Sequence, residues 1–140
     1  MSPREEPPAE GSFTQALTVP ASDIDLLGHA SNLAYLRWVQ DVAWAHSEAL
    51  GWDHARYLEL GAVFVVRRHE LDYLRQVLEG DALTVLTWVS GWKAATCLRQ
   101  TRIHRGEVLV ASAVTTWALM GVADGRPRRI PPAIRDAFGA

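Results

Sequence analysis

The segment at 32–50 constrains the fold most, because it predicts a helix that is apolar around most of its circumference. Polar side chains leave only a narrow stripe on it, so the helix must be covered on most sides. A sheet that wraps around it would provide that cover, and Gly51 is expected to end it. The residues that recur at helical spacing, with two tryptophans beside them, are Leu33, Leu36, Val39, Val42, Ala43, Trp38 and Trp44.

The chain beyond this helix changes to a two-residue period, which is typical of strands. After a short helical turn at 53–60, stopped by Gly61, four strand-length segments rich in Val, Thr, Leu and Trp are separated by glycine-containing turns. An earlier strand is expected from residue 13, and Pro20 suggests either an edge position for this strand or its end. The order predicts an α+β fold: strand, long helix, then about four strands in an antiparallel meander. The four segments are 62–75, 81–92, 95–105 and 107–120.

Length and charge narrow the class of protein. The chain of 140 residues fits one domain at 12–140, preceded by a tail at 1–11 that is rich in Pro and Glu and expected to be disordered. A net charge of -2 argues against a protein that coats nucleic acid. No apolar run approaches the ~20 residues that span a bilayer, and the N-terminus lacks a signal-peptide core. We therefore expect a cytoplasmic protein without a membrane partner.

The single cysteine, Cys97, excludes an internal disulfide. It lies in an alternating stretch, with neither a histidine nor a helix N-terminus beside it in the sequence. A reactive thiol needs such a neighbour to lower its pKa. Cys97 is therefore expected to be a small buried hydrophobic residue.

The stretch DIDLLGHAS at 23–31 places acids, a glycine and a histidine directly before the long helix. The first amides of a helix are unpaired and carry a partial positive charge, which suits a developing oxyanion. Gly28 permits a left-handed backbone that would fold the loop back over the helix end. Asp25 could then face the first amides, an arrangement that suits hydrolysis of an ester or thioester.

The same residues also allow a purely structural interpretation. Asp23, Asp25, Ser31 and Asn32 are all favoured around helix starts as caps or loop formers. His29 would then be only a loop histidine satisfied by hydrogen bonds. The local sequence leaves both interpretations open.

A longer pattern resembles a known family. Asp-x-Asp-x-x-Gly-His-x-x-Asn-x-x-Tyr-Leu, at 23–36, is similar to the hot-dog thioesterases of the 4-hydroxybenzoyl-CoA thioesterase family. Segments at 71–75, 80–81, 108–119 and 125–127 continue the resemblance, which covers about residues 13–138. It implies the hot-dog fold, a five-stranded antiparallel sheet wrapped around one long helix.

The resemblance also implies roles for single residues. Asp25 matches the family's catalytic carboxylate, a nucleophile or general base, and the amide of Asn32 matches the group that polarises the thioester oxygen. His29 matches a histidine of plant acyl-carrier-protein thioesterases that positions substrate or water. Those enzymes carry an Asn two residues before it, where this chain has Leu27, so we expect a mechanism centred on the carboxylate. Asp23 is expected to be structural.

Substrate binding is assigned to further residues of the same resemblance. Gly28 and Tyr35 belong to the pattern, and Lys93, Arg128 and Arg129 fall where the hydroxybenzoyl-CoA enzymes have basic residues. Those cations would bind the phosphates of a CoA or carrier-protein thioester, although ordinary surface charge explains them equally well. No cofactor or metal is implied. The family's active site forms between two subunits, so a homodimer or homotetramer is expected, with 63–66 of the partner completing the site.

Three other functions compete with this interpretation of the sequence. An acyl-thioester hydratase or dehydratase is disfavoured, because no Asn or Pro lies between Asp25 and His29. A noncatalytic module that binds acyl thioesters stays open, although the joint presence of Asp25, Gly28 and Asn32 argues against it. Nucleic-acid binding fails on net charge and on the lack of an exposed aromatic motif.

Overall fold

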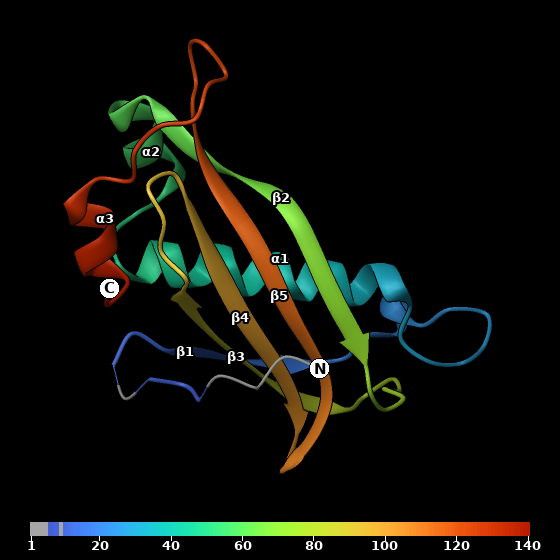
Figure 1. Cartoon of the computed structure of the whole chain (residues 1–140). Helices are drawn as coiled ribbons and strands as arrows, with labels where there is room; N and C mark the ends of the chain where they lie inside the picture. Colours follow the sequence, from blue (N-terminus) through green and yellow to red (C-terminus); the bar gives the residue numbers. More distant parts are fainter. Residues whose placement is uncertain (1–5, 9) are drawn as a thin grey trace.

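The computed structural model describes residues 6–8 and 10–140. The predicted tail at 1–11 falls partly on residues 1–5 and 9, which lie outside the described residues. The elements, shown in Figure 1, are β1 (Phe13–Thr18), η1 (Ala21–Asp23, a 3-10 turn), α1 (Asn32–Ala49), α2 (His54–Leu60), β2 (Ala62–Tyr73), β3 (Ala82–Ser90), β4 (Thr96–Arg105), β5 (Val108–Gly121) and α3 (Pro132–Ala137).

The five strands form one antiparallel sheet in the order β1-β3-β4-β5-β2. The expected α+β class and five-stranded sheet are confirmed, but the four-strand meander is wrong. Only β3, β4 and β5 follow one another across the sheet, while β2 pairs with β5 at the far edge. The reason is visible in Figure 1: α1 crosses the sheet, so the chain leaves β1 at one edge and returns as β2 at the other.

Both predicted helices form close to their expected limits. The side chain of Ser31 accepts a hydrogen bond from the amide of Ala34 and caps α1. Asp53 does the same for α2 through the amide of Arg56. Gly61 ends α2 with a φ of 81°, a left-handed conformation that L residues rarely adopt.

The core lies between α1 and the concave face of the sheet. Val39 and Val42 of α1 are almost fully buried, as are Val85 and Ile103 of the strands. A second apolar cluster joins α2, α3 and the ends of β2 and β5, around Trp52, Tyr57, Ala62, Leu119, Ile130, Ile134 and Phe138. The helix is not covered throughout, since Leu33 is 76% exposed and Trp44 43%. None of the helices in the described residues is long and apolar enough to cross a membrane.

Candidate functional site

The loop before α1 is a tight hairpin in which the backbones of Asp25 and His29 are paired. An isolated antiparallel bridge joins Ile24 to Ala30, and the amide of Asp25 donates to the carbonyl of His29 at 3.0 Å. The amide of Gly28 donates back to the carbonyl of Asp25 at 3.0 Å, and its φ is 87°. The loop projects beyond the start of α1 (Figure 1), so it extends the helix end rather than folding back over it.

The carboxylate of Asp25 does not cap the helix. Its Oδ1 accepts a hydrogen bond from the amide of Leu27 at 2.9 Å, within the same loop. Ser31 is the residue that caps α1, so of the two structural roles expected for Asp25, cap or loop former, the structure shows the second. The side chain is half-buried, and no described residue donates to its Oδ2. Asp25 therefore braces its own loop with one oxygen and leaves the other open to a ligand.

Asp23 has the structural role expected of it. It is 4% exposed, and both of its carboxylate oxygens accept hydrogen bonds from Arg37 Nη2 at 2.5 Å. Trp38 Nε1 donates to Oδ2 at 3.2 Å, and the amide of Ser31 donates to the carbonyl of Asp23 at 2.9 Å. These bonds tie the start of the hairpin to the cap and the second turn of α1.

The other predicted residues of this end differ in their surroundings. Asn32 is the exposed first residue of α1, and His29 is half-buried with no side-chain hydrogen bond to any described residue. Tyr35 is buried in the core, where its ring contacts those of Trp38 and Tyr73 at centroid distances of 5.0 Å. Burial raises the pKa of Tyr35. The roles assigned to these residues stay predictions.

The predicted phosphate-binding cations lie at the other end of the molecule. Lys93, Arg128 and Arg129 are all exposed, and a hydrogen bond of 2.8 Å from the amide of Ile130 to the carbonyl of Ala94 joins their two segments. An 18-residue helix spans about 27 Å, and α1 separates this end from the Asp25 loop. The fold therefore brings the cations together, but not with Asp25 of the same chain.

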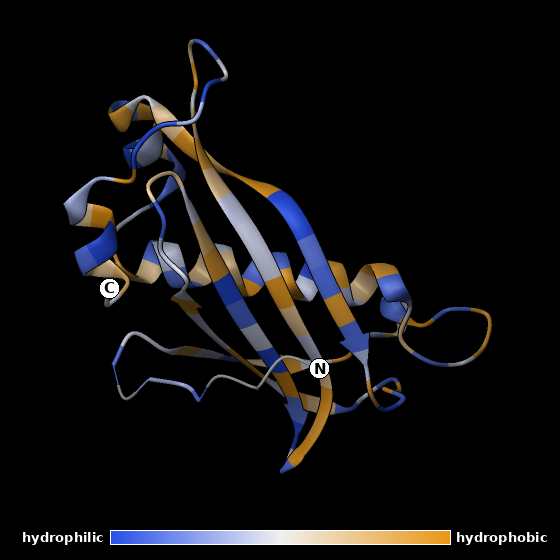
Figure 2. Ribbon diagram, in the orientation of Figure 1, coloured by the Kyte–Doolittle hydropathy of each residue, from blue (hydrophilic) through white to orange (hydrophobic). Residues whose placement is uncertain are grey.

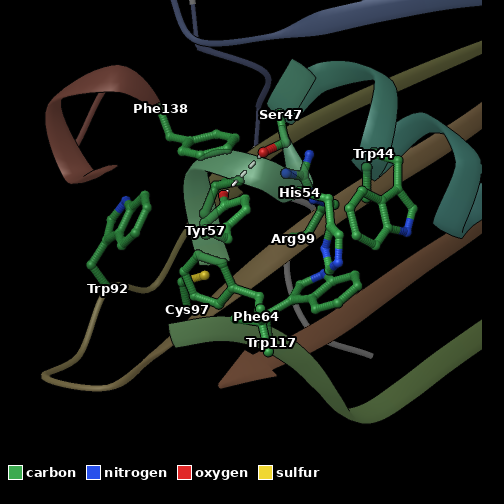
Figure 3. A pocket seen from close by; sticks show the side chains of 13 residues that line it. Trp44, Ser47, His54, Tyr57, Phe64, Trp92, Cys97, Arg99, Trp117 and Phe138 are labelled. Carbon is green, nitrogen blue, oxygen red and sulfur yellow. Dashed lines mark hydrogen bonds between the residues drawn. The ribbon is translucent and has the colours of Figure 1, made fainter. Parts of the chain in front are cut away.

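A cavity of about 60 Å³ lies at the same end, beside the last turns of α1 (Figure 3). Its walls are mainly aromatic, and one wall carries the guanidinium of Arg99. This site was not predicted from the sequence, although the alternation of inward-facing and outward-facing residues along β4 indicated it. Cys97 and Ile103 point inward there, so Arg99 must as well. The cavity is lined by Ala43, Trp44, Ser47, His54, Tyr57, Val63, Phe64, Val89, Trp92, Cys97, Arg99, Trp117 and Phe138.

Arg99 is 5% exposed and forms no ion pair with an acidic side chain of the described residues. Its Nη1 donates to His46 Nδ1 at 2.9 Å and to Thr87 Oγ1 at 3.1 Å, while its Nε has no hydrogen-bond partner among the described residues. Burial lowers the pKa of Arg99 to about 10, so the side chain remains a cation at neutral pH. The three ion pairs found in the described chain all lie elsewhere.

His46 and Cys97 are both uncharged beside this cation. His46 lies between the rings of Phe13 and Phe138, at 5.2 and 5.1 Å. Burial, and then the charge of Arg99, lowers the pKa of His46 to about 4, so its Nδ1 is an acceptor at neutral pH. Cys97 is buried as expected, and burial raises its pKa to about 11, which keeps it a thiol.

Replacing Asp23 should cost stability rather than chemistry. We expect Asp23→Ala to lower the free energy of unfolding by about 2 kcal/mol, because hydrogen bonds to a buried charged group are lost. Urea denaturation measures this loss. Asp25→Ala is the matched control and should cost less than about 1 kcal/mol, since it removes one half-exposed bond. Equal losses in the two variants would contradict the assignment.

The buried His46 should make stability depend on pH. Its folded-state pKa of about 4 lies below the usual 6.5, so the contribution is complete above pH 6.5 and is lost as pH falls toward 4. Between pH 7 and 5 the loss amounts to about 2 kcal/mol. Denaturation of wild type and His46→Gln at both pH values measures it. The variant should lose about 2 kcal/mol less, and identical losses would refute the role of His46.

Known proteins resemble this chain in sequence and in fold. In sequence, it is 26% identical over 139 residues to the chloroplastic acyl-(acyl-carrier-protein) hydrolase FATB3 of Cuphea viscosissima. That alignment covers 89% of this chain but only 32% of the plant enzyme, so this chain spans about a third of its relative's length.

Solved structures share the fold. A probable thioesterase from Bartonella henselae superposes with a TM-score of 0.78 at 25% identity, covering 86% of this chain and 99% of that one. A 1,4-dihydroxy-2-naphthoyl-CoA thioesterase from Synechocystis superposes with a TM-score of 0.83 at 18% identity, covering 91% and 96%. The sheet wrapped around α1 is thus the hot-dog fold. The family model of the Thioesterase-like superfamily matches residues 19–138, and the chain belongs to that superfamily.

Proposed function

We propose that this protein hydrolyses acyl thioesters and that Asp25 is the carboxylate that acts on the thioester carbonyl. The observation that carries this proposal is the open Oδ2 of Asp25, held by a tight hairpin directly before the N-terminus of α1. A carboxylate that activates water and helix amides that stabilise an oxyanion together suit thioester hydrolysis. Membership of the thioesterase superfamily supports the same reaction.

The reaction needs only water and the carboxylate. A water oxygen attacks the carbonyl carbon while Asp25 takes the proton, and the amide of Asn32 stabilises the oxyanion. The C–S bond then breaks, the proton passes to the sulfur, and the free acid and the thiol leave. Alternatively, Asp25 attacks the carbonyl carbon itself, the C–S bond breaks and the thiolate leaves as the mixed anhydride forms. Water then hydrolyses the anhydride to the free acid, which restores the Asp25 carboxylate and supplies the proton for the thiol. His29, paired with Asp25 across the hairpin, positions the water or the substrate.

The substrate is proposed to be an acyl-CoA or an acyl-carrier-protein thioester, as in the 4-hydroxybenzoyl-CoA thioesterase family. One relative is named as an acyl-carrier-protein hydrolase and another as a CoA thioesterase, which supports this choice. Gly28 and Tyr35 lie beside the reacting group in this proposal. Lys93, Arg128 and Arg129 would bind the phosphates, and since they lie at the far end of their own chain, a partner subunit would supply them. We assign this activity to the cytoplasm, from the sequence alone.

A homodimer is part of the proposal, because the Asp25 end exposes apolar surface. Leu26, Leu27 and Leu33 are 106%, 78% and 76% exposed, and the loop tip is hydrophobic in Figure 2. Covering a leucine side chain contributes roughly 1.5–3 kcal/mol, and such patches mark interaction sites. The edge strand β2 also has unpaired backbone groups, which a second β2 would satisfy. Residues 63–66 of the partner would then complete the site.

Replacing Asp25 tests the reaction directly. We expect Asp25→Asn to lower the rate of thiol release from acyl-CoA or acyl-carrier-protein substrates at least about 100-fold, with little change in stability. Asp53→Asn is the matched control, because the carboxylate of Asp53 also accepts one backbone hydrogen bond of 2.9 Å. A full rate in Asp25→Asn would reduce Asp25 to a loop brace. A wild type that binds thioesters without releasing thiol would be a binding module, and hydrated product would identify a hydratase.

Disturbing the β2 edge tests the dimer. Val65 is 39% exposed on β2, and Val65→Asp would place two charges in the joined edge. Sedimentation velocity should show a dimer for the wild type and at least a tenfold higher dissociation constant for the variant. Val108→Asp, at a valine that is 46% exposed at the first position of β5, should leave the dimer intact. A monomeric wild type would disprove the shared site.

A further inference from the structure

We propose that the cavity at the C-terminal end of α1 binds a small organic carboxylate, whose charged group pairs with Arg99 and whose apolar body packs against the aromatic walls. Within one chain, the cavity lies at the opposite end of α1 from the Asp25 loop. Binding of a free carboxylate there requires no hydrolysis, so the proposal stands whether or not the protein is a thioesterase.

The first argument is charge. Burying a cation without an anionic partner is costly, and buried charges in proteins are normally paired. The side chains that Arg99 contacts are neutral: a threonine, an uncharged histidine and the ring of Phe138, 5.6 Å from the guanidinium carbon. None of the described residues that line the cavity is an Asp or a Glu. An anion within it would supply the opposite charge that the described chain does not.

The second argument is the hydrogen-bonding balance. Three buried side-chain nitrogens lack a partner among the described residues, and two of them, Arg99 Nε and Trp117 Nε1, belong to residues that line this cavity. Both atoms are donors. The hydroxyl of Ser47 is already used, since it donates to the carbonyl of Trp52 at 2.6 Å and lies 3.0 Å from the hydroxyl of Tyr57. The cavity therefore has donors to spare, which a carboxylate would satisfy.

The third argument is shape. A cavity of about 60 Å³ holds roughly four waters or one small ligand group, which fits a carboxylate but not the nucleotide of CoA. The rings of Phe64, Trp92 and Phe138 surround the space in Figure 3. Trp44 and His54 are exposed at the rim, with their ring centroids 6.3 Å apart, and a ligand can enter there. The carboxylate would lie inside, with its apolar body toward this rim.

A titration followed by NMR tests the proposal on the wild-type protein. Benzoate and hexanoate are added, with benzamide and hexanamide as neutral partners of the same shape. We expect saturable shifts of the Trp117 indole N–H and the Arg99 Nε–H with the acids, and at least tenfold weaker binding of the amides. The Trp38 indole, which is bonded to Asp23, should not move. No saturable shift with either acid, or equal affinity for acids and amides, would overturn the proposal.

Two variants test whether Arg99 supplies the positive charge that binds the acids. Arg99→Met should weaken binding of the acids at least tenfold. Arg102→Met, on the opposite face of the same strand, should leave it unchanged. Undiminished binding to Arg99→Met would also overturn the proposal. Should Arg99→Met fail to fold, the comparison of acids with amides on the wild type decides the matter alone.

Discussion

The hydrogen bonds from Arg37 and Trp38 to the buried Asp23 carboxylate hold the Asp25 end of the molecule together. They connect the chain before the hairpin to the second turn of α1, while the capping residue Ser31 binds the carbonyl of Asp23. Asp25 is two residues from this anchor. Its position relative to the helix end is therefore set by a buried, charge-assisted contact, and not by the exposed leucines of the loop.

The two ends of α1 carry opposite chemistry. At the N-terminus, an anionic side chain lies before amides that carry a partial positive charge. At the C-terminus, where the helix end is partly negative, the cation Arg99 donates to His46 in the last turns. Each charge lies at the helix end that stabilises it. The two proposed sites, the hydrolytic site and the anion-binding cavity, thus lie at opposite ends of one long helix.

Much of the fold could be predicted from local sequence, because periodicity and capping act within a few residues. The helix at 32–49, the stop at Gly61 and the α+β class follow from such signals. The position of β2 at the far sheet edge could not be predicted, since strand pairing depends on contacts distant in sequence. Arg99 was missed for another reason, since an arginine in a strand normally faces water. Only its spacing of two residues from the inward-facing Cys97 and Thr101 indicated that it is buried. At the site itself, the structural role of Asp23 could be expected from the sequence. That Lys93, Arg128 and Arg129 lie at the same end of the molecule could not, because it depends on tertiary packing.

The most direct test of the account is a crystal structure of the Asp25→Asn variant with an intact acyl-CoA bound. The account predicts a thioester carbonyl oxygen about 3 Å from the amide nitrogen of Asn32, with the carbonyl carbon facing residue 25. It also predicts that the CoA phosphates lie against Lys93, Arg128 and Arg129 of the partner subunit. A thioester carbonyl bound away from the start of α1, for example in the Arg99 cavity, would contradict it.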